Sequence, residues 1–174
     1  MTPTKVENDE FLYRSIRANP SEPEEYSYAS GKLIISVSAF NDRGNKPSVD
    51  RSLLRDKPEE AKKNSSDGVA ALLAEDVRNI KGVKVTAERT DERTYYVDAI
   101  HRPLLADPVN LAHCQVECDP ELANPSRFRK IKEALAIIAT KHGFVIDPAE
   151  SAASASSAPT QSDVVRTEIG GEAR

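Results

Sequence analysis

The feature that most constrains this chain is the confinement of its periodic apolar residues to residues 11–148. Residues 1–10 are polar, and we expect them to be loose. From Ala149 the sequence reads AESAASASSAPTQSD and then VVRTEIGGEAR, with few large side chains to bury. Such a segment cannot offset the entropy that it would lose on ordering, so we predict a disordered Ala/Ser-rich tail over 149–174. A chain of 174 residues organised in this way has room for a single domain, which we place at 11–148.

Two helices are predicted inside this domain, over 125–142 and over about 68–81. Asn124 can cap the first helix, Pro125 suits its first position, and Gly143 suits the residue just past its end. Its apolar face has helical spacing and comprises Phe128, Ile131, Leu135 and Ile138. The apolar stripe of the second helix comprises Val69, Leu72, Leu73, Val77 and Ile80.

Segments rich in β-branched and aromatic residues, bounded by turn residues, predict strands. They are 12–14, 32–40, 83–87, 94–100, 111–117 and 144–146. The segments 83–87 and 94–100 lie too close together for a crossover connection, so we expect them to pair antiparallel. The predicted fold class is α+β, with a small, mostly antiparallel sheet and two main helices.

The charge of the chain limits the kinds of partner that it can bind. There are 24 Lys and Arg residues against 28 Asp and Glu residues, giving a formal net charge of −4. A general polyanion binder needs excess positive charge, so this balance argues against one. No long apolar run is present and the first residues lack the apolar centre of an export signal, so we expect a soluble cytoplasmic protein. The glycine-rich GxGxxG and GxxxxGK[ST] nucleotide motifs are absent from the sequence.

His101, His113, Cys114 and Cys118 are all competent zinc ligands. On a strand, however, His113 and Cys114 would point to opposite faces and could not easily bind one ion. We therefore expect no metal and two reduced thiols, with the histidines holding loop backbone groups. The alternative left open is an acid–base pair formed by the two histidines, one at each end of the segment 101–113.

Positive charge gathers at the start of the predicted helix 125–142, at Arg127, Arg129, Lys130 and Lys132. These side chains are spread around the helix rather than aligned in one stripe. They are typical of a solvated helix surface, and nucleic-acid binding through this helix is the second alternative function.

Three short motifs follow one another along the predicted strands. They are Leu-Tyr-Arg ending at Arg14, Ser36-Val37-Ser38, and Gln115-Val116-Glu117. In this order they resemble the Arg, Ser-x-Ser and Gln-x-Glu motifs of one class of ADP-ribosyltransferases. The middle motif has Val where Thr is usual, and only 22 positions separate Arg14 from Ser36.

The resemblance implies an NAD-consuming enzyme. Arg14, Ser36 and Ser38 would bind NAD, Glu117 would be catalytic, and Gln115 would orient the acceptor. A carboxylate in that role stabilises the oxocarbenium-like charge formed as nicotinamide leaves. The hypothesis requires the side chains of Arg14, Ser36 and Glu117 to converge on one cleft, within about 10 Å of one another.

A second resemblance, over residues 11–146, is to a set of short bacterial proteins of unassigned function. It rests on Leu-Tyr-Arg, Ala39-Phe40, Ser48-Val49-Asp50 and Asn110-x-Ala112-His113. It implies a small stand-alone domain and supplies no activity. Our leading prediction is therefore a binding or interaction module without a cofactor, with a protein partner, in a setting such as a bacterial defence or toxin–antitoxin system. We expect its interaction features in the tail and in the loops 41–65 and 101–110.

Overall fold

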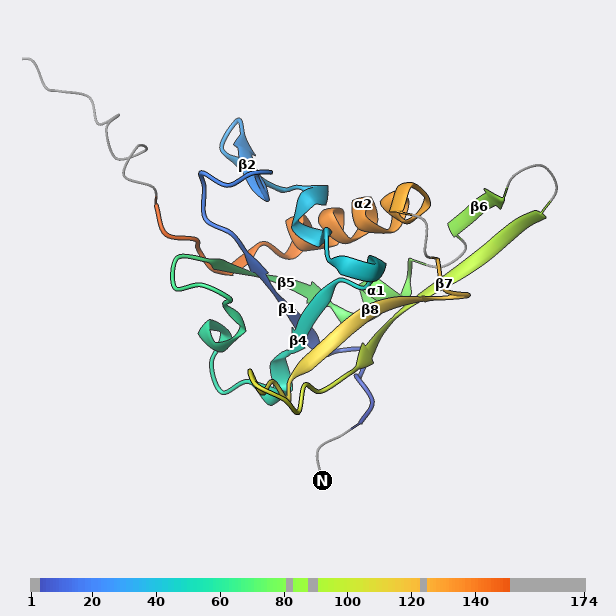
Figure 1. Ribbon diagram of the computed structural model, residues 1–174. Helices are drawn as coiled ribbons and strands as arrows, with labels where there is room; N and C mark the ends of the chain where they lie inside the picture. The colour runs from blue at the N-terminus through green and yellow to red at the C-terminus, as the bar shows by residue number, and fades with distance from the viewer. Residues whose placement is uncertain (1–3, 81–82, 88–90, 123–124, 151–174) are drawn as a thin grey trace, which may run out of the picture.

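The computed structural model describes residues 4–80, 83–87, 91–122 and 125–150 (Figure 1). In chain order, the strands are β1 (Phe11–Ile16), β2 (Tyr26–Ala29), β3 (Lys32–Ile35), β4 (Ser48–Arg51), β5 (Gly68–Leu73), β6 (Val83–Ala87), β7 (Asp91–His101), β8 (His113–Asp119) and β9 (Phe144–Ile146). The α-helices are α1 (Ala74–Arg78) and α2 (Pro125–His142), and the short 3-10 helices are η1 (Val37–Phe40), η2 (Arg43–Asn45), η3 (Ser52–Leu54) and η4 (Pro58–Ala61).

Within the described residues, seven strands form one sheet in the order β6-β7-β8-β4-β1-β5-β9, and each neighbouring pair is antiparallel. The predicted α+β class and the antiparallel pairing of the segments 83–87 and 94–100 are confirmed, but the sheet is larger than predicted. Strands β2 and β3 form a separate hairpin. Its two turn residues, Ser30 and Gly31, both have positive φ (51° and 75°), as a type I′ turn requires.

The predicted helix over 68–81 is wrong in its first half. Residues 68–73 form β5, which pairs with β1 on one side and with β9 on the other. Nearly every residue of β5 is buried, so the side chains on both faces of this strand are shielded from solvent. A continuous apolar run of this kind does not distinguish a helix from a buried strand by periodicity. The helix itself is only α1, which begins at Ala74 and ends at Arg78.

Other boundaries also differ from the predicted ones. The predicted strand 32–40 ends at Ile35, and η1 follows because it carries Ala39 and Phe40 into the core. The strand predicted over 111–117 is β8, displaced by two residues. Strand β4 has no predicted counterpart, since only one of its four residues is apolar.

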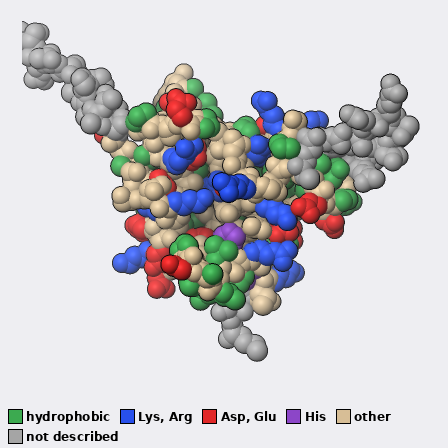
Figure 2. All heavy atoms as spheres, in the orientation of Figure 1, with side chains coloured by type: hydrophobic (Ala, Val, Ile, Leu, Met, Phe, Trp, Pro, Cys, Tyr) green, Lys and Arg blue, Asp and Glu red, His purple; other side chains and the backbone are tan. Residues whose placement is uncertain are grey.

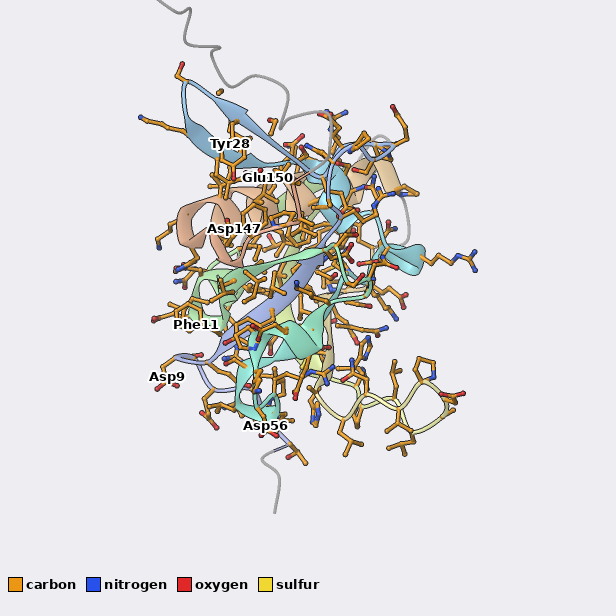
Figure 3. The ribbon with its side chains drawn as sticks, turned by 90° about the vertical axis from the view of Figure 1, so that its left-hand side faces the viewer. Asp9, Phe11, Tyr28, Asp56, Asp147 and Glu150 are labelled. Atoms are coloured by element: carbon orange, nitrogen blue, oxygen red, sulfur yellow. The ribbon has the colours of Figure 1, made fainter. Side chains whose placement is uncertain are left out.

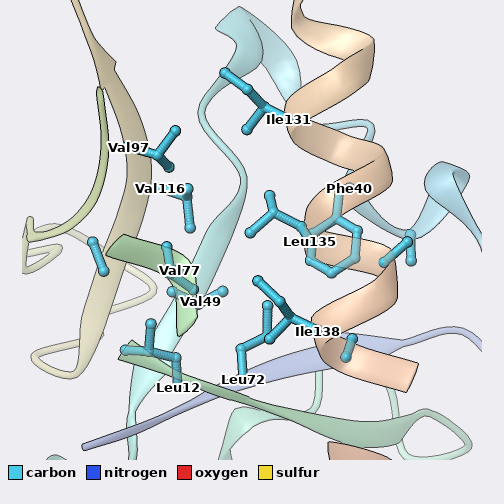
Figure 4. Packing of buried hydrophobic residues seen from close by; sticks show 14 of the residues in the cluster. Leu12, Phe40, Val49, Leu72, Val77, Val97, Val116, Ile131, Leu135 and Ile138 are labelled. Carbon is cyan, nitrogen blue, oxygen red and sulfur yellow. The ribbon is translucent and has the colours of Figure 1, made fainter. Parts of the chain in front are cut away.

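Helix α2 has the predicted bounds and the predicted apolar face. Gly143 follows it with φ of 76°, the left-handed conformation that glycine favours after a helix. Figure 4 shows Ile131, Leu135 and Ile138 of α2 pointing at side chains of the sheet. One cluster of buried apolar residues joins both α-helices, η1 and one face of the sheet.

Two side chains of the N-terminal segment that was expected to be loose are buried. Val6 is buried in the core, and the Glu10 carboxylate is buried against Arg51, with the two Nε–Oε1 and Nη2–Oε2 distances at 2.9 and 2.8 Å. At the other end, Ala149 N donates to Ser66 O, and Gly68 lies so close to Pro148 that a β-carbon there would come within 2.6 Å of the proline ring. The predicted tail beyond residue 150 lies outside the described residues.

The two faces of the sheet differ in what covers them. One face, formed by residues such as Leu12, Val49 and Val116, packs against α1 and α2. The alternate residues point to the other side, which we call the outer face. The side view in Figure 3 shows Asp56 near the lower end of the molecule and Tyr28 near the upper end. None of the helices in the described part of the chain is both long and apolar enough to cross a membrane.

Candidate functional site

The residues assigned to NAD binding and catalysis lie on both faces of the sheet. Arg14 shares the helix-covered face with its strand neighbours Leu12 and Ile16, and its guanidinium lies 5.5 Å from the centre of the Phe40 ring. It donates to the backbone oxygens of Ala39 (2.8 Å) and Ser48 (2.6 Å), and it forms an ion pair with Asp42. These bonds make Arg14 a connector of η1 and β4.

Glu117 and Gln115 point to the outer face, because Val116 between them is in the core. Glu117 accepts hydrogen bonds from Arg102 at 2.9 and 3.3 Å, and this pairing raises the pKa of Arg102. It lines a cavity of about 410 Å³ beside Tyr96 and Ile100.

Arg14 and Ser38 line a different cavity, of about 290 Å³, and the Ser38 hydroxyl donates to the Glu24 carbonyl. Ser36 precedes η1 and lines neither of these cavities. Of the five residues, the structure therefore brings Arg14 and Ser38 together but separates them from Gln115 and Glu117. Among the described residues, Arg14 and Glu117 thus point to opposite faces of the sheet, an arrangement that does not fit the single cleft required by the NAD hypothesis.

The basic residues of α2 lie at its exposed start. Arg129 forms an ion pair with Glu133 at 3.0 Å, and Lys132 donates to Asn41 at 2.7 Å. The side chain of Arg127 lies outside the described residues. The five cavities described for this structure, which together involve β1, β4, β7, β8 and α2, are not lined by Arg129, Lys130 or Lys132.

Both cysteines are free thiols, as predicted. Burial raises the pKa of Cys114 to about 12 and also raises the pKa of the half-buried Cys118. His113 and Cys114 do point to opposite faces of the sheet, since Cys114 is in the core and His113 is on the outer face. Across residues 4–80, 83–87, 91–122 and 125–150, no three His, Cys, Asp or Glu side chains are grouped so that they could hold a metal ion.

A cavity of about 560 Å³ opens on the outer face, where β1, β4 and β8 lie side by side. We call it the outer cavity. Its floor comprises Tyr13, Ser15, Ser48, Asp50 and His113. One wall is the segment 55–63, which contributes Arg55, Glu60, Ala61, Lys62 and Lys63, and the other is the loop 104–110, which contributes Leu104, Pro108, Val109 and Asn110. Strand register places Asp50 directly opposite both Tyr13 and His113.

Polar contacts hold most of the floor in fixed positions. Asp50 accepts from Arg55 Nε at 3.0 Å and from Asn110 Nδ2 at 2.8 Å, so one carboxylate ties both walls to β4. His113 lies between the Arg102 carbonyl, 2.6 Å from Nδ1, and the Ser48 hydroxyl, 3.2 Å from Nε2. In the described part of the chain, the half-buried Tyr13 hydroxyl has no hydrogen-bond partner.

The rim of the outer cavity is apolar and exposed on the loop side. Leu104 and Val109 line the cavity and are exposed, Val109 by 62%, and Leu105 on the same loop is 77% exposed. Figure 2 shows a group of hydrophobic side chains at the lower part of this face, next to a histidine, with Lys and Arg side chains around both. Large exposed apolar groups gathered in this way mark interaction sites.

The sequence pointed to parts of this site, but it assigned possible chemistry only to His113, as one member of an acid–base pair or as a metal ligand. Ser48, Asp50, Asn110 and His113 lie in the motifs on which the resemblance to short bacterial proteins rests, and the predicted interaction loops 41–65 and 101–110 border the outer cavity. Tyr13 lies in the Leu-Tyr-Arg motif and Arg55 in the predicted loop 41–65, but neither was singled out as a site residue, because β4 and its pairing with β1 were not predicted. No protein-family model, curated protein or solved structure matches this chain.

Proposed function

We propose that the protein is a binding module that takes an acidic segment of a partner protein, with an acidic side chain in the outer cavity and apolar neighbours on the loop 104–111. This function is supported by one observation: basic residues line a cavity, and exposed apolar side chains lie directly beside it. Pockets that bury a ligand group beside a few fixed polar groups are the usual sites of recognition.

The charges of the cavity favour an acidic group. Arg55, Lys62 and Lys63 line it against Asp50 and Glu60. Asp50 is already neutralised by Arg55, at 3.0 Å from Nε. Within the described residues, the Lys62 ammonium makes only a long contact with the Ser65 carbonyl, at 3.5 Å, and the Lys63 ammonium lies 3.9 Å from Asp42. Both ammonium groups can therefore reach a new carboxylate.

The apolar rim favours a polypeptide over a small ion. Leu105 and Val109 lie on the loop that forms one wall of the cavity. Burying their apolar surface under a partner lowers the free energy by about 25 cal/mol for each Å² removed from water. A peptide can place an acidic side chain inside and an apolar side chain on the rim. Because the whole chain has a net charge of −4, it does not attract an acidic peptide at long range, and binding must depend on these local contacts.

Selection from a random peptide library displayed on phage, against the full chain, tests the proposal. We expect selected peptides to combine Asp or Glu with a large apolar residue within a few positions. Synthetic copies should bind at least about tenfold more weakly to Lys62→Glu/Lys63→Glu, a loss of about 1.4 kcal/mol. Lys130→Glu is the matched control, because Lys130 is an exposed lysine on α2, away from the cavity.

The apolar contribution is tested with a second pair of variants. Leu105→Ser should weaken the same peptides, whereas Ile137→Ser, at a similarly exposed position on α2, should not. Selection of basic peptides, or equal loss in both members of either pair, would refute the proposed site. Competition by oligonucleotides that depends on Lys62 and Lys63 would reassign the cavity to nucleic acid.

A further inference from the structure

Ser48 and His113 form a hydrogen-bonded pair in the floor of the outer cavity that the binding function does not use. A backbone carbonyl can only accept, so the 2.6 Å contact with the Arg102 oxygen places a proton on His113 Nδ1. In the neutral imidazole, Nε2 is then the acceptor, and the Ser48 hydroxyl 3.2 Å away donates to it. The ring is held in place, because His113 is buried and fixed by the pairing of β8 with β4.

This is the arrangement of an activated serine nucleophile. Such a site needs a hydroxyl within reach of a base, and a third group that orients the base from its other nitrogen. In this protein the third group is the Arg102 carbonyl, in place of a carboxylate. The hydroxyl lines a cavity, so an acyl group can approach it.

We propose that Ser48 reacts as a nucleophile with small carboxylic esters that bear a negative charge, with His113 as the general base. Ser48 Oγ forms a bond to the acyl carbon while its proton passes to His113 Nε2. The bond from the acyl carbon to the leaving alkoxide then breaks, and His113 returns the proton to that alkoxide. Water, activated by His113, hydrolyses the acyl–Ser48 ester and restores both residues. The positive charges of Lys62 and Lys63 favour the negatively charged ester and attract the oxyanion.

Ser15 provides an internal control, because it lines the same cavity but is activated less. Its hydroxyl donates to Asp67 at 2.8 Å and accepts from the Lys63 N–H at 3.0 Å. A carboxylate is a weaker base than an imidazole near neutral pH, so Asp67 activates the Ser15 hydroxyl less than His113 activates that of Ser48. A reagent that labels reactive serines should therefore discriminate between Ser48 and Ser15.

The test is labelling of the full chain with a fluorophosphonate, in which Ser48 Oγ displaces fluoride and one adduct forms. Intact-mass and peptide-mass spectra should place a single adduct on Ser48. Ser48→Ala should abolish it, and this variant should fold, because the backbone N–H and carbonyl of residue 48 keep their bonds to Asp42 and Arg14. His113→Gln should slow labelling by at least about 100-fold, while Ser27→Ala, on β2 outside the outer cavity, should leave the rate unchanged.

Circular dichroism verifies the fold of each variant, and His113→Asn serves as a second variant if His113→Gln unfolds. No adduct on the native protein, an adduct elsewhere than Ser48, or an unchanged rate in a folded His113 variant would overturn the proposal. This inference does not rest on the proposed peptide binding. Peptide affinity measured with Ser48→Ala separates the two, because removing one hydroxyl leaves Lys62, Lys63 and the apolar rim in place.

Discussion

Breaking the buried ion pair of Glu10 and Arg51 is expected to have a large effect on stability. Both side chains have no exposed surface, and the guanidinium meets the carboxylate through Nε and Nη2 at 2.9 and 2.8 Å. This hydrogen bonding raises the pKa of Arg51 above its ordinary value. Glu10→Gln keeps the shape of the side chain but leaves the guanidinium buried without its counter-charge.

The cost follows from the burial. Removing one partner of a buried ion pair destabilises proteins by about 3–5 kcal/mol, against a total stability of about 5–15 kcal/mol. The Lys5 carbonyl still accepts from Arg51 Nη2 at 2.9 Å in the variant, so we expect the lower end, about 3 kcal/mol. Glu10→Gln/Arg51→Met, which removes both charges, should be more stable than Glu10→Gln alone.

Urea unfolding followed by circular dichroism measures these free energies through the midpoint and the slope. Arg129→Gln is the matched control, because it breaks an exposed pair with Glu133 and should cost less than about 0.5 kcal/mol. If Glu10→Gln is within about 1 kcal/mol of the wild type, or if the double variant is less stable than the single one, the reasoning from burial is refuted.

Three further outcomes follow from the core and from the shifted pKa values. Alkylation of the native protein near pH 8 should modify Cys118 slowly and spare Cys114, because burial raises the pKa of both thiols, that of Cys114 to about 12. From about pH 9 to 12 the unfolded Cys114 thiol ionises while the buried one stays protonated, so this residue should lower the stability by about 1.4 kcal/mol per pH unit. Unfolding curves of Cys114→Ala should show a fall with pH that is shallower by that amount. Hydrogen bonds from His142 and, to a smaller extent, Lys141 lower the pKa of Asp76 in the folded protein. The stabilisation from Asp76 should therefore be present above its unfolded pKa of about 4 and be lost as the pH falls through its folded pKa. Unfolding curves should show that Asp76→Asn costs less than about 1 kcal/mol near neutral pH and nothing in strong acid. Leu135→Ala, in the centre of the core, should cost about 2–5 kcal/mol in the same urea assay.

The elements predicted well from the sequence are those specified by local signals. Helix α2 carries a proline at its first position, an apolar face of helical spacing, and Gly143 after its end. Strands β6 and β9 coincide with the predicted segments. In each case the determining residues are neighbours in the chain, so local conformation and burial favour the same structure.

The elements predicted badly are those that depend on distant partners. The apolar run of β5 is compatible with a helix, and only its pairing with β1 and β9 makes it a strand. Strand β4 is almost entirely polar, and it lies in the middle of the sheet because β1 and β8 satisfy its backbone groups and Glu10 neutralises its buried Arg51. The sequence gives no sign that residues 4–10 are held in place, because their partners, such as Arg51 for Glu10, lie far along the chain.

The candidate site follows the same division. By itself, the sequence determined an α+β chain with one well-defined helix, free thiols and a list of polar residues in short motifs. The tertiary structure alone decided that Arg14 and Glu117 face opposite sides of the sheet, and that Ser48 and His113, 65 positions apart, share a hydrogen bond. The physical reason is that side-chain direction alternates along a strand, so one pairing register sets every face, and that register is fixed by contacts between segments that no local pattern encodes.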